Sequence, residues 1–454
     1  MSSVKKLAIR GTIWTIASYG SSQILRFGSN LILTRLLVPE VFGLMALVYV
    51  FIIGINLFSD LGIGPSLIQN KRGDEPDFYN TAWTMQVFRS IGIWFCCLLI
   101  AWPASILYGE PQLFFLIPAV GFNSVLDGFK STSEVMLNRR LEIGKLSFYE
   151  FVGQIISIVV MIILAAIYRN VWSLVIGSLV SALILTVWSH WWVPGVRNRF
   201  FWETEAAKSI FSFGKWIFIS TALTFVSEQA DRLILGRLIT LASLGVYGIA
   251  FALSDIPRQV LTALSGKVLF PAFSKFADLP RPEFRAKIQK NRKIFLLGAT
   301  LGVAVLASIG DKLIPLLYPK AYDDAAWMLP LLAIGFWPRI LTQTIDAALF
   351  AVGQSRYPAL GSFLKFLYMS IGLPLGFHLM GGSQGYGLQG ALIVIALNDI
   401  PYYGAVLYGL WRERLACVMQ DLKATALFFT LLAVFIGIRS ALGFGFPLEK
   451  MFLP

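Results

Sequence analysis

The sequence predicts an all-α polytopic membrane protein in which two parallel six-helix bundles surround a central cavity, with about one extra span at the C-terminal end. Three observations lead to this class: a scarcity of charge, the length of the apolar windows, and an internal repeat. Of the 454 residues, 57% are hydrophobic and only 14% are charged, whereas soluble proteins carry about 25% charged residues. This composition excludes a water-soluble enzyme.

The apolar residues fall in windows of about 20, the length that a helix needs to cross about 30 Å of hydrocarbon. Glycine, proline or charge ends each window, and no polar linker divides the chain as it would in a soluble protein of this length. In order, the predicted spans cover residues 12–37, 41–63, 82–106, 112–133, 147–168, 171–193, 209–235, 244–266, 294–317, 326–350, 358–380, 388–411 and 423–441.

The C-terminal end leaves the number of spans between twelve and fourteen. Residues 441–454 are apolar but too short to cross the membrane. With thirteen spans the C-terminus would lie outside the cell, and with twelve or fourteen it would lie inside.

An internal repeat predicts how the spans are organised. Leu31–Gly43 (LILTRLLVPEVFG) aligns without gaps to Leu233–Gly245 (LILGRLITLASLG) at an offset of 202 residues, with arginine and glycine at matching positions. Six predicted spans separate the copies, and because six is even, both halves cross the membrane in the same direction. This predicts two bundles related by an axis along the membrane normal, as in transporters that expose one site alternately to each side.

The repeat places an N-terminal six-helix lobe at residues 1–200 and a C-terminal six-helix lobe at 201–415. An additional span and tail follow at 416–454. A purely structural interpretation of the repeated residues is also open: a tight outer turn could use the glycines for backbone freedom and the arginines as headgroup anchors.

The net charge of +13 would suggest nucleic acid in a soluble protein. In a membrane protein, basic residues instead gather in the cytoplasmic loops. Here they gather in the loops on the same side as the N-terminus, which predicts a cytoplasmic N-terminus and no nucleic-acid partner. The longest of these loops, 267–293, carries Phe284 and Ile288 among basic residues, so we expect an amphipathic helix lying on anionic headgroups.

The sequence contains no pattern for a metal, a cofactor or ATP. His190 and His378 lie near opposite membrane edges, and no HExxH or GxxxxGK[ST] motif occurs. All predicted outer loops are short, which argues against an enzyme that carries catalytic groups there. Energy for any transport must then come from an ion gradient, the membrane potential or the substrate gradient.

Ionisable residues inside the spans are the best candidates for function. A charge at the bilayer centre costs about 2.5–3.5 kcal/mol, so such residues usually face a polar cavity or a partner. Arginine matches phosphate oxygens with a rigid fork and lysine offers a point charge, which together suit an anionic headgroup. The predicted substrate-binding residues are Arg26, Arg89, Lys215, Arg258 and Lys365.

Structural ion pairs are the alternative for these cations. Asp255 and Arg258, three residues apart on one helix face, could simply neutralise each other. Any of the other cations could likewise pair with a carboxylate on a neighbouring helix.

Acidic residues inside the spans could carry a coupling proton or sodium ion, because burial raises a carboxyl pKa towards the range where protons exchange. The candidates for this role are Asp60, Asp127, Glu134 and Glu150. The alternative is that each neutralises a nearby cation. Asp127, Lys130 and Glu134, at spacings of three and seven on one face, could satisfy one another.

Five motifs occur in order across both halves: LILTRLLVPEVFG at 31–43, DLGIG at 60–64, EQADRLILGR at 228–237, LGVY at 244–247 and VLFPAF at 268–273. Together they resemble the bacterial polysaccharide transporter family, the Wzx-type oligosaccharide flippases similar to colanic acid and exopolysaccharide exporters. The resemblance implies the multidrug/oligosaccharidyl-lipid/polysaccharide exporter fold, with two six-helix lobes around a cavity.

The resemblance also implies an activity in the cytoplasmic (inner) membrane. The family moves undecaprenyl-diphosphate-linked oligosaccharide repeat units from the inner to the outer leaflet by alternating access, without a catalytic residue or cofactor. Cavity arginines face the diphosphate, one of them in the first span, where Arg26 fits. The implied partners are the lipid-linked oligosaccharide, membrane lipids, and the polysaccharide polymerase and export machinery.

Two other functions compete with this interpretation. An ion-coupled secondary transporter of small molecules, of the multidrug type, would share the architecture, but the many predicted cavity cations argue against cationic drugs. A membrane-embedded polymerase or ligase that acts on the same lipid is disfavoured by the short outer loops.

Overall fold

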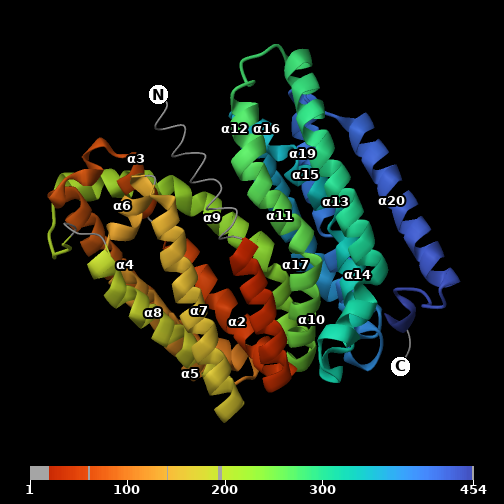
Figure 1. The fold of residues 1–454 in the computed structure, drawn as a ribbon, viewed down its shortest axis with the longest axis horizontal. Helices are drawn as coiled ribbons and strands as arrows, with labels where there is room; N and C mark the ends of the chain where they lie inside the picture. Colours follow the sequence, from red (N-terminus) through yellow and green to blue (C-terminus); the bar gives the residue numbers. More distant parts are fainter. Residues whose placement is uncertain (1–19, 60–61, 141, 193–196, 452–454) are drawn as a thin grey trace. The chain divides into compact units, whose positions relative to one another are not determined.

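The computed structural model describes residues 20–59, 62–140, 142–192 and 197–451, and in these residues the regular secondary structure is helical (Figure 1). The chain forms two compact units, Met1–Phe225 and Val226–Pro454. Their boundary falls within a single helix. The lobe boundaries at residues 200 and 415, which the repeat indicates, stay a prediction.

The first described helix of the N-terminal unit covers residues 20–36. The helices that follow are α2 (Pro39–Phe58), α3 (Ile63–Gln69), η1 (Lys71–Asp74), α4 (Pro76–Tyr108), α5 (Leu113–Gly128), α6 (Ser133–Arg139), α7 (Ile143–Tyr168), α8 (Trp172–Trp192) and α9 (Thr204–Leu238), which continues into the second unit. Proline at the first position starts α2 and α4, where its missing N–H is not needed. Gly109 ends α4 in the left-handed conformation, with φ of 69°.

The C-terminal unit contains the remaining helices. They are α10 (Leu241–Ser254), α11 (Ile256–Leu264), η2 (Ser265–Leu269), α12 (Phe270–Ser274), α13 (Arg281–Leu317), η3 (Lys320–Tyr322), α14 (Ala325–Gly335), α15 (Trp337–Gln343), α16 (Asp346–Ala351), α17 (Arg356–Leu379), η4 (Gly382–Gln384), α18 (Gly387–Ala396), α19 (Asp399–Arg412), α20 (Val418–Ala441) and η5 (Glu449–Met451).

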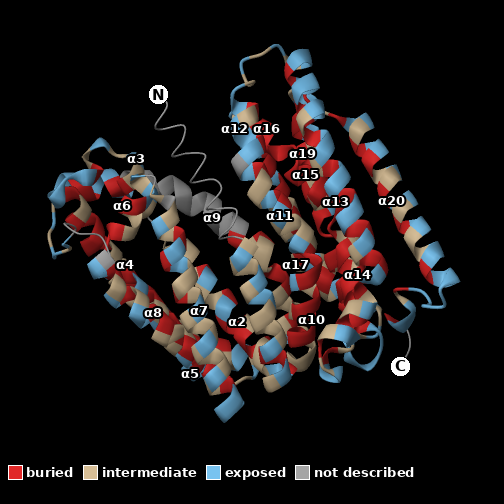
Figure 2. Ribbon diagram, in the orientation of Figure 1, coloured by how far each residue is buried: buried red, intermediate tan, exposed pale blue. Residues whose placement is uncertain are grey.

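The helices confirm a polytopic membrane protein. Among the described residues, eight helices are long and apolar enough to cross a membrane, or ten if each of two bent pairs forms one span. Every predicted window from 41–63 onwards overlaps a helix. Large apolar side chains are exposed on these helices, such as Leu99 at 76% and Trp102 at 63% on α4. Figure 2 shows exposed and buried positions alternating along such helices, as expected when one face meets lipid.

The internal repeat corresponds to a repeated structural element. The helices end at residues 36 and 238, and the next ones begin at Pro39 and Leu241, so both intervals equal the 202-residue offset. The N-cap residues Val38 and Thr240 share an extended conformation, with φ, ψ of −79°, 157° and −70°, 156°. Arg35 and Arg237 are both exposed in the last turn. Their exposure favours the interpretation as headgroup anchors.

The prediction of a surface-lying helix at 267–293 is wrong for its second half. Residues 281–293 form the first turns of α13, whose 37 residues extend for about 55 Å, well beyond the hydrocarbon thickness. Phe284 and Ile288 are 0% exposed and pack with Phe273 and Leu349 in a core cluster. The apolar face of this segment therefore meets the protein's own interior and not the headgroups.

Helix α20 is an integral part of the C-terminal unit, running along α13 (Figure 1). A buried ion pair joins the two helices near each end. Arg292 of α13 lies 2.6 Å from Asp421 of α20, and Arg439 of α20 lies 2.6 Å from Asp311 of α13. The residues of the first pair precede those of the second pair along both helices. The two helices are therefore parallel.

Breaks in the helices coincide with the charged residues. The axis bends by 62° between α5 and α6 and by 41° between α14 and the following helices. Asp255 lies at the α10–α11 junction, and Asn398 and Asp399 at the α18–α19 junction. A break leaves backbone groups without helical partners, which inside a membrane requires a polar or buried environment. The breaks thus bring polar backbone and charged side chains together.

Candidate functional site

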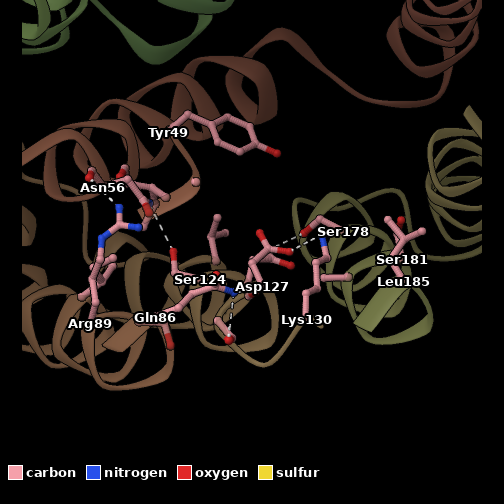
Figure 3. A pocket seen from close by; sticks show the side chains of 18 of the residues that line it. Tyr49, Asn56, Gln86, Arg89, Ser124, Asp127, Lys130, Ser178, Ser181 and Leu185 are labelled. Atoms are coloured by element: carbon pink, nitrogen blue, oxygen red, sulfur yellow. Dashed lines mark hydrogen bonds and ion pairs between the residues drawn. The ribbon is translucent and has the colours of Figure 1, made fainter. Parts of the chain in front are cut away.

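The N-terminal unit contains a polar cavity of about 570 Å³ between α2, α3, α4, α5, α7 and α8 (Figure 3). We call it the N-terminal cavity. Its polar lining is dominated by hydroxyl and amide groups. The polar lining residues are Tyr49, Asn56, Gln86, Arg89, Ser90, Asn123, Ser124, Asp127, Lys130, Ser157, Ser178 and Ser181.

Arg89 is a predicted site residue that lines this cavity from α4. Its Nη2 donates to the backbone oxygen of Asn56 at 3.0 Å, and its Nε donates to the Ser59 hydroxyl at 3.3 Å. The Asn56 side-chain amide in turn donates to Ser124 Oγ at 3.2 Å. These contacts with the end of α2 fix the guanidinium at the cavity wall.

A second charged group lies where α5 ends. Lys130 Nζ and Asp127 Oδ1 form an ion pair at 2.7 Å, and both residues line the cavity. The Gln86 amide donates to the carbonyls of Asp127 and Gly128 at 3.2 and 3.1 Å. This cap satisfies carbonyls that the end of α5 leaves without helical partners. The cavity therefore combines two cations and a carboxylate with neutral hydrogen-bonding groups.

Other predicted residues lie elsewhere in this unit. The predicted common face of Asp127, Lys130 and Glu134 is not formed, because the helix breaks after Gly128 and Glu134 lies on α6 beyond the bend. Glu150 is exposed on α7 and Arg26 is exposed on the helix at 20–36. None of Arg26, Glu134 and Glu150 lines the N-terminal cavity.

Two predicted site residues fall outside what the structure describes. Asp60 lies outside the described residues. Lys215 belongs to α9, but its side chain is outside the described part.

The C-terminal unit contains a closed cluster of charged side chains, in which Arg258, Arg339 and Asp399 lie close to helix breaks. We call Glu228, Arg258, Arg339, Lys365 and Asp399 the C-terminal ion-pair cluster; the space that they line measures about 20 Å³. Lys365 Nζ lies 2.9 Å from Asp399 and 3.8 Å from Glu228. Arg339 Nη2 lies 3.5 Å from Glu228. The space is of the size that holds a single water molecule.

Both predicted cations of this cluster have carboxylate partners. Arg258 pairs with both carboxylate oxygens of Asp255, with Nη2 and Oδ2 2.9 Å apart. The alternative that these two residues neutralise each other is thus what the structure shows. Lys365 likewise faces Asp399. In this conformation the cluster has no room for a sugar or a diphosphate.

Arg339 is also a cation of this cluster, although it is not among the predicted substrate-binding residues. Its guanidinium lies 4.2 Å above the centre of the Tyr402 ring. Its buried Nε and Nη1 have no hydrogen-bond partner among the described residues. The guanidinium is thus held mainly by the Tyr402 ring and the Glu228 carboxylate.

The neutral lining of the N-terminal cavity is what sequence reasoning missed. A signal was present, since polar residues recur at helical spacing inside apolar windows. Ser124 and Asp127 are three residues apart on α5, and so are Ser178 and Ser181 on α8. Such spacing puts polar side chains on one face of a helix. Among the described residues, no group of three His, Cys, Asp or Glu is placed to hold a metal ion.

Comparison with known proteins establishes the family. The model described as "Polysaccharide biosynthesis protein" matches residues 32–326, well over half of the chain. This chain belongs to that family. The match confirms the resemblance that the ordered motifs predicted.

Two of the similar curated proteins are named for polysaccharide biosynthesis or transport. The succinoglycan biosynthesis transport protein ExoT of Rhizobium meliloti (strain 1021) is 24% identical over 275 residues, covering 60% of this chain and 54% of that protein. The chain thus spans about half the length of this relative. The lipopolysaccharide biosynthesis protein WzxC of Escherichia coli (strain K12) is 21% identical over 405 residues, covering 88% of this chain and 81% of that protein.

A solved structure shows the same fold. The lipid II flippase MurJ in its inward closed conformation aligns with a TM-score of 0.65 at 14% identity, covering 95% of this chain and 99% of that chain. At this identity the likeness concerns the fold alone. It confirms the predicted all-α membrane architecture.

Proposed function

We propose that this protein is a flippase that moves undecaprenyl-diphosphate-linked oligosaccharide repeat units across the cytoplasmic membrane by alternating access, for polysaccharide export. The observation that carries the proposal is the N-terminal cavity, which presents two cations among hydroxyl and amide groups within a membrane-embedded unit. Membership of the polysaccharide biosynthesis protein family supports it.

The chemistry of the cavity suits a sugar phosphate. Sugar hydroxyls both donate and accept hydrogen bonds, and the serine, asparagine and glutamine side chains of the lining do the same. Arg89 and Lys130 supply the positive charge that a diphosphate needs. The cavity volume of about 570 Å³ lies within the usual range for small-molecule sites.

Transport of this kind needs no covalent step, and we propose that the protein is not an enzyme. The headgroup would bind against Arg89 and Lys130 on the cytoplasmic side and leave on the outer side after the two halves rearrange, while the polyprenyl tail stays in lipid. Consumption of the flipped repeat unit requires a polymerase and export machinery on the outer side, and these are the proposed partners.

The proposed orientation has the N-terminus in the cytoplasm and the protein in the inner membrane. It rests on the basic residues at one end of the spans, such as Lys71, Arg139, Lys145 and Arg412. Basic loops remain on the cytoplasmic side during insertion.

The test is complementation of a deletion strain. We expect the deletion to accumulate lipid-linked oligosaccharide on the inner leaflet and to lose surface polysaccharide, and the wild-type gene to reverse both. Unchanged surface polysaccharide without accumulation of the lipid intermediate would overturn the function.

Variants of the same strain test the site. Arg89→Glu should abolish export at normal protein levels, because it places a carboxylate where the diphosphate would bind. Arg237→Glu is the matched control, since Arg237 is exposed in the last turn of α9. Arg26→Glu tests the position that the family resemblance implies. Full export with Arg89→Glu would refute the site while leaving the function standing.

A further inference from the structure

A groove of about 660 Å³ lies between α13 and α20 in the C-terminal unit, away from the C-terminal ion-pair cluster. We call it the α13–α20 groove. Lysine side chains line it from both helices, and no aspartate or glutamate is among its lining residues. The three lysines are Lys290 and Lys293 of α13 and Lys423 of α20. All three are exposed.

The groove changes from basic to apolar along its length. On α13, Lys290 and Lys293 are followed by Leu296 and Leu297, and on α20 Lys423 is followed by Leu427. Because the two helices are parallel, the lysines of both lie at the same level. The lining residues Ala286, Gln289, Met419 and Gln420 precede them, and the leucines follow them. The distance from Lys290 to Leu297 along the helix is about 10 Å at 1.5 Å per residue.

The walls of the groove are held in place by contacts beneath it. Arg292 and Asp421 form their buried ion pair between the same two helices. The Gln420 side-chain amide donates to the backbone oxygen of Gln289 at 2.9 Å. These contacts hold together the two helices that carry the lysines, without need of a ligand.

The three ammonium groups have no ion-pair partner in the part of the chain that the structure describes. Among the described residues, no carboxylate forms an ion pair with Lys290, Lys293 or Lys423, although ion pairs are frequent elsewhere in this unit. Three cations at one level of the groove, with leucines on one side of them, attract an anion that also carries an apolar part.

We propose that the α13–α20 groove binds one anionic phospholipid from the membrane leaflet at the basic end of the spans. The phosphate lies against the three lysines and an acyl chain follows Leu297 and Leu427 towards the membrane centre. The order of basic and apolar residues along the groove matches the order of headgroup and acyl chain in a phospholipid. Basic pockets between transmembrane helices recognise anionic headgroups in this way.

The occupant is a membrane lipid and not the transported cargo. The groove opens at the outward face of α13 and α20, where Leu297, Met419 and Leu422 are exposed. It belongs wholly to the C-terminal unit and shares no lining residue with the N-terminal cavity. The bound lipid would join α20 to α13 over the buried Arg292–Asp421 pair, as a further contact between the two helices.

The experiment measures lipid at the groove in the full-length purified protein. Leu297→Cys, in a Cys96→Ser background, carries a bimane fluorophore, and phosphatidylglycerol or phosphatidylcholine with brominated acyl chains quenches it. We expect phosphatidylglycerol to reach half-maximal quenching at about tenfold lower concentration than phosphatidylcholine, given the attraction of each lysine for an anionic headgroup.

Matched triple variants distinguish the effect of the lysines in the groove from the effect of the net charge of the protein. Replacing Lys290, Lys293 and Lys423 by glutamine should remove the preference for phosphatidylglycerol, and replacing them by arginine should keep it. The control triple replaces exposed basic residues outside the groove by glutamine and should keep the preference. Its positions are Lys275, Arg285 and Arg412.

Three results would overturn the proposal. The first is equal quenching by the two lipids in the wild-type protein, and the second is a preference that survives the glutamine triple. The third is full displacement of phosphatidylglycerol by inorganic phosphate at equal concentration, which would show a phosphate site without a lipid. If the glutamine triple does not elute as a monodisperse protein, the three single variants are measured instead, each expected to lower the preference.

Discussion

Breaking the buried ion pair between Arg292 and Asp421 should detach the start of α20 from the rest of the C-terminal unit. Arg292 is fully buried, with two hydrogen bonds and one ion pair. Its Nε donates to Thr344 at 2.7 Å, its Nη2 donates to the Leu341 carbonyl at 2.8 Å, and its Nη1 lies 2.6 Å from Asp421. Tyr403 donates to the other carboxylate oxygen of Asp421 at 3.0 Å.

The loss of stability in each variant depends on which buried charge remains without its partner. Asp421→Leu leaves a buried guanidinium without its carboxylate, and removing one partner of a buried pair costs about 3–5 kcal/mol. Arg292→Met leaves Asp421 with the Tyr403 hydroxyl, so we expect a cost at the lower end of that range. The double variant leaves no buried charge, and it should cost less than the sum of the two single variants by about 3 kcal/mol.

Two assays read the effect, one global and one local. Unfolding by sodium dodecyl sulfate in mixed micelles gives the free energy of unfolding of the wild type, the two single variants and the double variant, which together form a double-mutant cycle. Reaction of Cys417 with a maleimide, in a Cys96→Ser background, reports on α20 itself, because Cys417 is buried directly before that helix. Burial raises the pKa of the Cys417 thiol above its ordinary value, which slows the reaction further at neutral pH.

We expect both single variants to label faster than the wild type and the double variant to label at close to the wild-type rate. Strict additivity of the two single costs would refute the reasoning, because it would mean that the two charges do not depend on each other. Unchanged labelling of Cys417 in Asp421→Leu would likewise show that the pair does not hold the start of α20.

Three further changes test other contacts by the same unfolding assay. Arg439→Met removes the ion pair with Asp311 and two donors to the carbonyls that follow α20, so it should cost about 3–5 kcal/mol; a cost under 1 kcal/mol would contradict the burial of this pair. Gly390→Ala should cost about 1–3 kcal/mol by overpacking, because the new methyl would lie 2.2 Å from the Gly376 oxygen, while Gly404→Ala meets no atom within 4 Å and serves as the neutral control. Asp399→Asn leaves the Lys365 ammonium with only the more distant Glu228 and should destabilise the unit more than Glu228→Gln does; the reverse order would refute the assignment of Asp399 as the main partner.

Most of the helical architecture was predictable because its cause is local. An apolar window long enough to cross the membrane must satisfy its own backbone hydrogen bonds, and only a helix does this within one segment. The windows at 147–168 and 423–441 therefore match α7 and α20 closely. The repeat predicted a second turn like that at Val38, and the same extended conformation recurs at Thr240.

The placement of amphipathic and charged groups was not predictable in the same way. Phe284 and Ile288 show an apolar face at helical spacing, and that pattern is the same whether the face meets headgroups or a protein core. Likewise, a lysine inside a span calls for a polar environment, but its sequence position does not say whether this is a ligand or a carboxylate such as Asp399.

The sequence by itself therefore determined that the chain is a helical membrane protein, where its helices run, and which family motifs it carries. Only the tertiary structure decided that Arg89 lines a cavity rich in hydroxyl groups, that Arg258 and Lys365 lie in ion pairs, and that α20 is joined to α13 at both ends. The reason is that helix formation depends on neighbours in the chain, whereas the partner of a charge is set by contacts between residues far apart in the sequence.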